Sequence, residues 1–433
     1  MARYAISVTE HTLLAHRQPA TPDAATELLG LSDLATTSDT PSAQQRSGFA
    51  EMARAITGFS APLGVLDRRA FTTNVATLRN RADGVPLRVA SKSVRSVPVL
   101  HAVLRVPGFQ GVLAYSLRES IWLVRDGLDD VVVAYPSVDT AVLTELISDQ
   151  TLSDAITLMV DHPDHLGLLA SVHRQAGSPP HRFRVCLDLD CSYRFAGLHL
   201  GTRRSPIHHR QQAVNAARAV IATPALNLVG IMGYEAQVAG VNDTSPAVRM
   251  LKKLSVPELT ARRGAAVSAI GELTELEFVN GGGTGSVEST RIDPSVTEIT
   301  VGSGLYASHY FDHYTTFTQR PATYFVLDIT RIPAPGYVTA AGGGWIASGA
   351  PGPDRLPVPV YPEGLRLTSR EGAGEVQTPM TVAAGHQVGI GDRVWMRHTK
   401  AGELCEHLNE LHVVDGADHL GVVTTYRGEG QMW

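Results

Sequence analysis

Short apolar runs alternate with helical stretches over about 250 residues of this chain, from Pro62 to about Tyr314. Continuous apolar strands separated by helices are typical of a parallel sheet that helices cover. Eight or nine such units match a (β/α)8 TIM barrel better than an open doubly wound sheet. The expected strands are Leu63–Leu66, Leu87–Ala90, Gly111–Tyr115, Val131–Ala134, Ile156–Val160, Phe183–Leu189, Leu226–Ile231, Leu276–Val279 and Glu298–Val301.

Nine strands are one too many for an eight-stranded barrel, so the first, Leu63–Leu66, is a candidate for membership of a neighbouring domain. The longest expected helix, Val248–Leu273, should be interrupted at Pro257, because proline lacks the amide that the helix needs. The other helices expected between the strands are Arg68–Asn80, Leu117–Arg125, Thr140–Ser148, His165–Ala176 and Gln211–Ile221.

After about Tyr314, strand-like runs recur between turns rich in glycine and proline, and only residues 403–407 resemble a helix. This pattern predicts a C-terminal antiparallel β domain. We therefore expect an N-terminal extension (1–58), a barrel (59–315) and a β domain (316–433). The extension should hold short helices at Thr21–Leu29 and Gln44–Ile56, with a loop at Thr36–Ala43. The strands expected in the β domain are Ala322–Ile332, Tyr337–Ala340, Gly364–Thr368, Val388–Met396 and Glu410–Val414.

Bulk properties exclude several classes of partner. The formal net charge of -5 argues against nucleic-acid binding, and the pairs Arg203–Arg204 and Arg262–Arg263 are expected to be solvated. Three cysteines make no disulfide framework, which suggests a reducing, cytoplasmic setting. The chain begins without a signal-peptide pattern, and no apolar stretch reaches the ~18 residues of a membrane span.

The stretch LRVASKSVRS, Leu87–Ser96, carries one lysine in a turn of small residues after a strand. Burial at the carboxyl mouth of a strand disfavours the charged form of Lys92, which lowers its pKa and frees the amine as a nucleophile. A Schiff-base lysine needs such an amine. The alternative is a solvated lysine in a strand-to-helix turn.

Two loops rich in small residues follow the last expected barrel strands. The first holds Gly282, Gly283, Thr284 and Gly285, whose backbone N–H groups could converge on a phosphate. Phosphates often bind in the last βα loops of barrels, and the alternative is a turn without a ligand. The second loop holds Gly304 and Tyr306; this tyrosine either contacts the ligand or closes the barrel rim.

Two further strands end in polar residues. In DLDCSYRFAG, Asp188–Gly197, Arg194 could donate to a phenolate or carboxylate, or form an ion pair that holds the loop. In GYEAQ, Gly233–Gln237, Tyr234 would face the barrel mouth, whereas Glu235 is expected in a hydrogen-bond network at the rim.

The β domain contains His398, Glu403, Cys405 and His407 within ten residues, a set that could ligate a metal. The spacing matches no closed zinc pattern. One helical turn would place Glu403 and His407 on one face, where a plain Glu–His contact explains the pattern equally well.

A lysine early in a barrel, an arginine halfway round and a glycine-rich loop near its end are what a pyridoxal-phosphate enzyme needs. With these motifs in this order, the sequence resembles the alanine-racemase-fold (fold type III) pyridoxal-phosphate enzymes. Within them it is most similar to the D-threonine aldolase and D-serine dehydratase branch, amino acid deaminase/aldolase type. The resemblance covers roughly residues 62–433 and rests on ASKS, an AYP turn at Ala134–Pro136, DLDCSYRFAG, GGGTGS and EITVGSGLYASHYFD.

The resemblance implies a role for each motif. Lys92 would form the aldimine with the cofactor, Arg194 would contact its phenolic oxygen, and Tyr306 would lie nearby. The loop Gly281–Ser286 would bind its phosphate. A head-to-tail homodimer acting on a small-molecule amino acid is also implied.

One departure concerns the metal. Enzymes of this branch carry a His-x-Cys or His-x-Asp metal pair in the β domain, where this chain has His398-Thr399-Lys400. An ammonium group would repel a divalent cation, so Lys400 is a candidate for supplying the positive charge instead.

Three reactions follow from one substrate–cofactor adduct: retro-aldol cleavage to glycine and an aldehyde, dehydration to a keto acid and ammonia, and racemisation. The resemblance places them in that order, with a D-threonine-like substrate. Lys92 is the expected base at the α-carbon in the last two. A non-catalytic pyridoxal-phosphate carrier is the alternative from another class.

Overall fold

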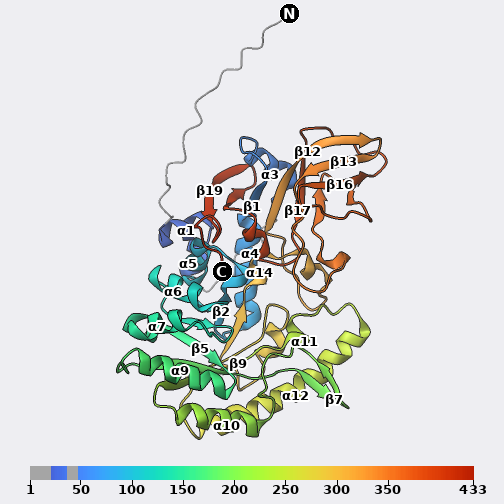
Figure 1. Cartoon of the computed structure of the whole chain (residues 1–433). Coiled ribbons are helices and arrows are strands. Elements are labelled where there is room, and N and C mark those ends of the chain that lie inside the picture. The colour runs from blue at the N-terminus through green and yellow to red at the C-terminus, as the bar shows by residue number, and fades with distance from the viewer. Residues whose placement is uncertain (1–20, 37–46) are drawn as a thin grey trace, which may run out of the picture.

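The computed structural model describes residues 21–36 and 47–433 of this 433-residue chain. Eight parallel strands close into a barrel in the order β10-β11-β2-β3-β4-β5-β6-β9, with helices outside, in the lower half of Figure 1. The predicted barrel is confirmed. Its strands are β2 (Leu87–Ala90), β3 (Phe109–Ala114), β4 (Val131–Val133), β5 (Ile156–Val160), β6 (Phe183–Asp188), β9 (Leu226–Gly233), β10 (Phe278–Gly281) and β11 (Glu298–Val301).

Most helices around the barrel lie where the sequence predicts them, but those at Val97–Leu104 and Gln150–Ala155 were not predicted. The helix α12 (Pro246–Gly271) is continuous through Pro257 rather than interrupted there. Ser255 and Leu259 are buried on either side of Pro257, so packing on both sides compensates for the lost hydrogen bond. The other helices are α4 (Arg68–Ala82), α5 (Val97–Leu104), α6 (Leu117–Arg125), α7 (Thr140–Ser148), α8 (Gln150–Ala155), α9 (Pro163–Gln175) and α10 (Arg210–Ile221).

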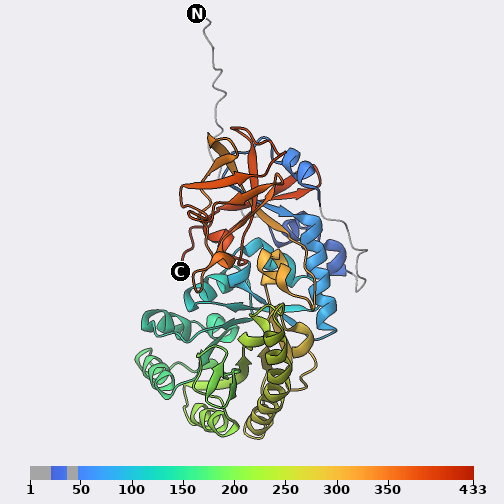
Figure 2. The same cartoon turned by 90° about the vertical axis from the view of Figure 1, so that its right-hand side faces the viewer.

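A nine-stranded sheet forms the β domain, which lies above the barrel in Figure 2. Strand β1 belongs to this sheet, as predicted from the ninth strand that an eight-stranded barrel cannot include. Leu63 pairs with Val326 of β12, and Val65 pairs with His412 of β18. The β1–β18 pair is parallel, whereas the remaining pairs of this sheet are antiparallel. The strands are β1 (Leu63–Asp67), β12 (Thr323–Ala334), β13 (Tyr337–Ala341), β14 (Val358–Tyr361), β15 (Leu365–Leu367), β16 (Gln377–Val382), β17 (Arg393–Arg397), β18 (Glu410–Asp415) and β19 (Asp418–Thr424).

Three of these strands, β14, β16 and β19, were not predicted, and β17 starts at Arg393 rather than Val388. Gly389 N donates to Asp392 Oδ2 at 2.7 Å, so the residues before β17 form a turn. The residues expected to be helical after β17 form a single 3-10 turn, η4 (Glu403–Glu406).

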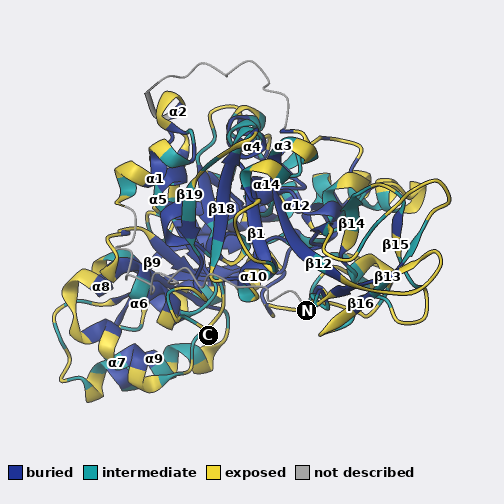
Figure 3. Ribbon diagram, turned by 90° about the horizontal axis from the view of Figure 1, so that it is seen from above, coloured by how far each residue is buried: buried dark blue, intermediate teal, exposed yellow. Residues whose placement is uncertain are grey.

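The N-terminal extension packs onto the rest of the chain. Its described helices are α1 (Pro22–Leu28), α2 (Ser32–Thr36) and α3 (Phe49–Ala55). Residues 37–46, which include most of the expected loop and the start of the second expected helix, lie outside the described residues. Met52 and Ile56 pack against Trp395 in the core of the β domain, and Figure 3 shows this buried interior from above. The division at residues 58 and 315 stays a prediction.

None of the described helices is both long and apolar enough to cross a membrane.

Candidate active site

Lys92 lies in the 3-10 turn η1 (Ser91–Ser93), which directly follows β2 at the mouth of the barrel. Val94 N and Arg95 N both donate to Ser91 O at 2.8 Å, and Ser91 Oγ donates to a backbone carbonyl of β3 at 3.2 Å. The Lys92 side chain is exposed, so the expectation that burial prepares its amine is wrong for the chain alone. The turn instead presents the amine to ligands from a fixed backbone.

Tyr306 lies behind this turn. It ends α14 (Ser303–Tyr306), is 0% exposed, and donates its hydroxyl to Val94 O at 3.1 Å. Burial raises the pKa of the Tyr306 hydroxyl well above its usual value, so the group stays a neutral donor. A direct contact of Tyr306 with a ligand stays a prediction; its contact in the chain is with the backbone after Lys92.

A segment of the β domain, residues 398–407, packs against the Lys92 turn. Gly402 has a φ of +84°, and a Cβ there would lie 2.0 Å from Lys92 O. Cys405 Sγ donates to Val94 O at 3.5 Å, and the Arg95 guanidinium pairs with Glu406. Two motifs about 300 residues apart in sequence therefore form one site.

A buried carboxyl group lies beside the turn. Glu119 is 0% exposed and accepts hydrogen bonds from Tyr115 N at 2.7 Å and from Tyr426 Oη at 2.9 Å. Burial raises the pKa of Glu119 from 4.5 to about 7, although the hydrogen bonds that its carboxyl group accepts lower it. The sequence did not indicate this residue, because a glutamate in the first turn of an amphipathic helix is ordinary.

This carboxyl group should make stability depend on pH. Between pH ~4.5 and ~7 the folded chain holds a proton on Glu119 that the unfolded chain has released, so the free energy of unfolding should fall as pH rises. Glu119→Gln should flatten that fall in urea titrations at several pH values. Asp188, whose pKa is also raised to about 7, contributes with the same sign and is present in both proteins. An equal slope in the variant and the wild type would contradict this prediction.

The glycine-rich loop after β10 leaves two backbone donors unused. Gly283 N donates to Ser286 Oγ at 3.1 Å, and Gly304 N donates to Thr284 Oγ1 at 3.1 Å. The N–H groups of Thr284 and Gly285 donate to no acceptor in the part of the chain that the structure describes. A Cβ at Gly285 would lie 2.3 Å from a backbone carbonyl of the neighbouring helix, so only glycine fits there. The loop can therefore bind an anion.

Glu235 positions this loop from behind, within the predicted hydrogen-bond network. It accepts hydrogen bonds from Gly282 N at 2.8 Å and from Thr290 Oγ1 at 2.7 Å, so the Gly282 donor is not free for a ligand. Arg263 lies 3.6 Å from Glu235 and pairs with Asp293 at 2.8 Å. The expectation that Arg263 is solvated is wrong: its side chain is 2% exposed, because two buried carboxylates compensate its charge.

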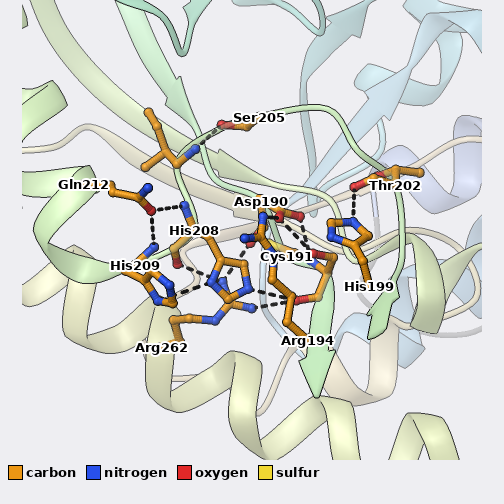
Figure 4. A network of polar contacts seen from close by, with 12 residues as sticks. Asp190, Cys191, Arg194, His199, Thr202, Ser205, His208, His209, Gln212 and Arg262 are labelled. Atoms are coloured by element: carbon orange, nitrogen blue, oxygen red, sulfur yellow. Dashed lines mark hydrogen bonds and ion pairs between the residues drawn. The ribbon is translucent and has the colours of Figure 1, made fainter. Parts of the chain in front are cut away.

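Arg194 lies on β7 (Tyr193–Phe195), which forms a hairpin with β8 (Leu198–Leu200). Its guanidinium pairs with Asp190 (Figure 4), and its side chain is 41% exposed. Burial raises the pKa of Asp190, but hydrogen bonds from Ser192 and Arg194 outweigh it and hold the pKa below its usual value. The ion pair expected as one alternative is present, and the contact of Arg194 with a ligand stays a prediction.

Arg262, also expected to be solvated, is mostly buried and donates to the carbonyls of Asp190 and Ser192.

A cavity of about 510 Å³ opens beside Arg194. Basic side chains line it, among them Arg203 and Arg204, together with the carboxylate of Asp161. The two arginines are exposed, as expected, but face this cavity. Arg204 lies 5.0 Å from the ring centroid of Tyr234. The sequence offered a signal that was missed, since Asp161 directly follows a barrel strand.

Asp188 ends β6 close to this cavity. Burial raises its pKa to about 7, the charges of Asp161 and Asp190 add to this shift, and Arg204 opposes it. A carboxyl group that titrates near neutral pH is able to exchange protons in this part of the site.

The two β-domain candidates, His398 and Lys400, differ in burial and in hydrogen-bond partners. His398 is 3% exposed, and neither ring nitrogen has a hydrogen-bond partner in the described chain. Burial lowers its pKa to about 3, with help from Arg397, so the ring is neutral. Lys400 is half-buried, and its Nζ donates to Ser348 O at 2.7 Å and Ser348 Oγ at 3.1 Å.

Lys92 follows β2 and lies close enough to Lys400, which follows β17, for their charges to interact, and Tyr306 lies behind the Lys92 turn. Tyr234 and Arg194 follow β9 and β6, and the glycine-rich loop follows β10. Because the carboxyl ends of parallel barrel strands lie at one end of the barrel, all these groups face the same mouth.

Comparison with solved structures shows that the chain has the alanine racemase fold. A D-threonine aldolase from Filomicrobium marinum matches with a TM-score of 0.73 and 18% identity, over 86% of this chain and 96% of that one. An alanine racemase from Bacillus anthracis matches with a TM-score of 0.57 and 13% identity, over 86% of this chain and 99% of that one.

A D-threo-3-hydroxyaspartate dehydratase from Delftia sp. HT23 gives a TM-score of 0.65 at 17% identity, over 86% of this chain and 98% of that one. Among curated proteins, a 3-hydroxy-D-aspartate aldolase from Paracoccus denitrificans is 25% identical over 228 residues, 52% of this chain. The chain thus spans about half, 54%, of the length of that relative. No family model matches the sequence.

Proposed function

We propose that this chain is a pyridoxal-phosphate-dependent lyase that cleaves a D-threonine-like β-hydroxy-α-amino acid to glycine and an aldehyde. The observation that carries the proposal is the exposed Lys92 on a fixed turn, at the same barrel mouth as a glycine-rich loop with two unused N–H groups. The proteins of similar fold and sequence, named as D-threonine aldolase and 3-hydroxy-D-aspartate aldolase, support the choice of reaction.

The residues present fit the cofactor. The Lys92 amine is free to hold its aldehyde carbon, and the N–H groups of Thr284 and Gly285 are free for its phosphate. Arg194 and Tyr234 are the further residues proposed to hold it. The cofactor supplies an electron sink for negative charge that develops at the substrate α-carbon.

The chain's own residues then decide which bond breaks. Lys92 Nζ is the group proposed to take or return the proton at the α-carbon in dehydration or racemisation. Retro-aldol cleavage instead needs the proton of the β-hydroxyl removed. The polar side chains that the β domain brings against the Lys92 turn suit chemistry at that oxygen, and they favour the first two reactions over racemisation.

A product screen tests the proposal. The holoprotein is incubated with D- and L-threonine, D- and L-serine and 3-hydroxyaspartate. Glycine plus an aldehyde is the expected result. A keto acid plus ammonia would instead establish a dehydratase. The structural similarity to the dehydratase from Delftia sp. HT23 motivates this second assay. Inverted amino acid alone would establish a racemase, and bound cofactor without turnover would establish a carrier.

We also propose that the chain works as a homodimer in the cytoplasm. The family resemblance motivates the dimer, and the three cysteines, all free and buried, support a reducing compartment. Light scattering of the holoprotein tests the assembly.

A further inference from the structure

The side chains of residues 398–407 that could ligate a metal have other partners or are sealed. Glu403 accepts a hydrogen bond from Ser348 N at 3.2 Å, and Glu406 pairs with Arg95. The ring of His407 stacks on Trp345 at 4.8 Å with an interplanar angle of 2°. Within the described residues, no group of three His, Cys, Asp or Glu side chains could hold a metal ion.

The remaining two groups, Cys405 and His398, are both buried. The Cys405 thiol donates to Val94 O at 3.5 Å. His398 is buried next to Arg397. A divalent cation at His398 would lie beside the guanidinium of Arg397, which repels it, and would lack a set of three carboxylate, thiolate or imidazole ligands among the described residues. The residues present therefore do not fit a metal.

Lys400, two residues after His398, supplies a positive charge that Ser348 holds in place. Its Nζ has three N–H groups, and Ser348 accepts two of them through its carbonyl and hydroxyl oxygens. The third N–H has no acceptor among the described residues and is left for a ligand. Glu403 also binds the backbone N–H of Ser348, so the acceptor that orients the ammonium is itself held.

Lys400 and Lys92 lie close enough for their charges to interact. Gly402, two residues after Lys400, packs on the carbonyl of Lys92 itself. Burial lowers the pKa of Lys400, and the positive charges of Arg355 and Lys92 add to this, while Glu403 opposes it. The chain has only four lysines against 33 arginines, and two of those four lie together here. Two ammonium groups close enough to interact repel each other, and an anionic or strongly polar ligand bound between them would relieve that repulsion.

We propose that this site works without a divalent metal and that Lys400 binds the β-oxygen of the substrate through its free N–H group. The proposal rests on the proposed function for the identity of the substrate. Lys400 polarises the β-oxygen and stabilises negative charge that develops on it, as a metal ion would, without becoming bonded to the substrate.

The test compares Lys400→Met and Lys400→Arg with the matched control Lys253→Met, an exposed lysine on α12. Cofactor absorbance is used to titrate D-threonine and D-alanine, which differ in the β-hydroxyl. In Lys400→Met the apparent dissociation constant for D-threonine should rise about 10- to 100-fold, the loss of one charged hydrogen bond. The value for D-alanine should stay within about twofold, Lys400→Arg should retain part of the difference, and the control should behave as the wild type.

Metal content of the purified holoprotein is the second measurement. Divalent ions should be substoichiometric, and chelator should leave D-threonine binding unchanged. A stoichiometric ion that disappears in His398→Ala would overturn the proposal, as would equal weakening of D-threonine and D-alanine in Lys400→Met. These binding and metal readouts do not require turnover, so they remain decisive if the product screen rejects the lyase.

Discussion

Replacing Lys92 with alanine should abolish turnover and the absorption band near ~420 nm of the bound cofactor, with no loss of fold. The side chain is exposed, and the hydrogen bonds of its turn come from Ser91, Val94 and Arg95, so truncation removes no buried contact. The free energy of unfolding should therefore change by no more than about 0.5 kcal/mol. If Lys92 also acts as a base, its loss alone costs roughly 10²- to 10⁴-fold in rate.

Because the chain has only four lysines, the lysine that holds the cofactor can be identified directly. Borohydride reduction of the wild-type holoprotein should fix the cofactor to one of only four lysines, and peptide mapping distinguishes them. Lys253→Ala, on the exposed surface of α12, is the control and should keep both the band and the label on Lys92. Persistence of the band in Lys92→Ala would show that another lysine holds the cofactor.

The barrel could be predicted from sequence because its signal is local. Each barrel strand is a short apolar run, and α6 and α7 have the predicted bounds. The count of nine strands even identified β1 as a member of the other sheet. The β domain was harder, since β14 and β16 contain prolines and few buried residues, and such strands carry a weak periodic signal.

The chemistry of single side chains depended on contacts that no local pattern contains. Glu119 and Arg263 look like ordinary charges on helices, yet both are buried by partners far away in sequence: Tyr426 for the first and Asp293 for the second. For Lys92 the error was the opposite one: the sequence predicts a buried lysine at the end of a strand, and the side chain is exposed. Sequence motifs therefore located the barrel mouth, whereas the environment of its charged groups followed only from long-range packing, between the domains for Glu119 and within the barrel for Arg263.

Among Gly→Ala substitutions in the β domain, Gly402→Ala should disturb the active site most, because Gly402 is where the β domain packs on Lys92. At a φ of +84°, the new Cβ would lie 2.0 Å from Lys92 O and 3.0 Å from Ser93 Cα, both backbone atoms that cannot rotate away. Either the Lys92 turn or residues 398–407 must move. A displacement of about 1 Å at a reacting group is enough to cost roughly 10²-fold in rate.

Gly385→Ala separates this effect from backbone strain. Gly385 has nearly the same φ, +86°, but a Cβ there meets nothing within 4 Å. Both variants pay about 1 kcal/mol for placing a side chain at positive φ, which should appear as a similar part of the loss in melting temperature. Only Gly402→Ala should also lose kcat and shift the cofactor absorbance, since only that methyl group pushes on Lys92. Equal kcat in the two variants would mean that the β domain covers the lysine without fixing its position.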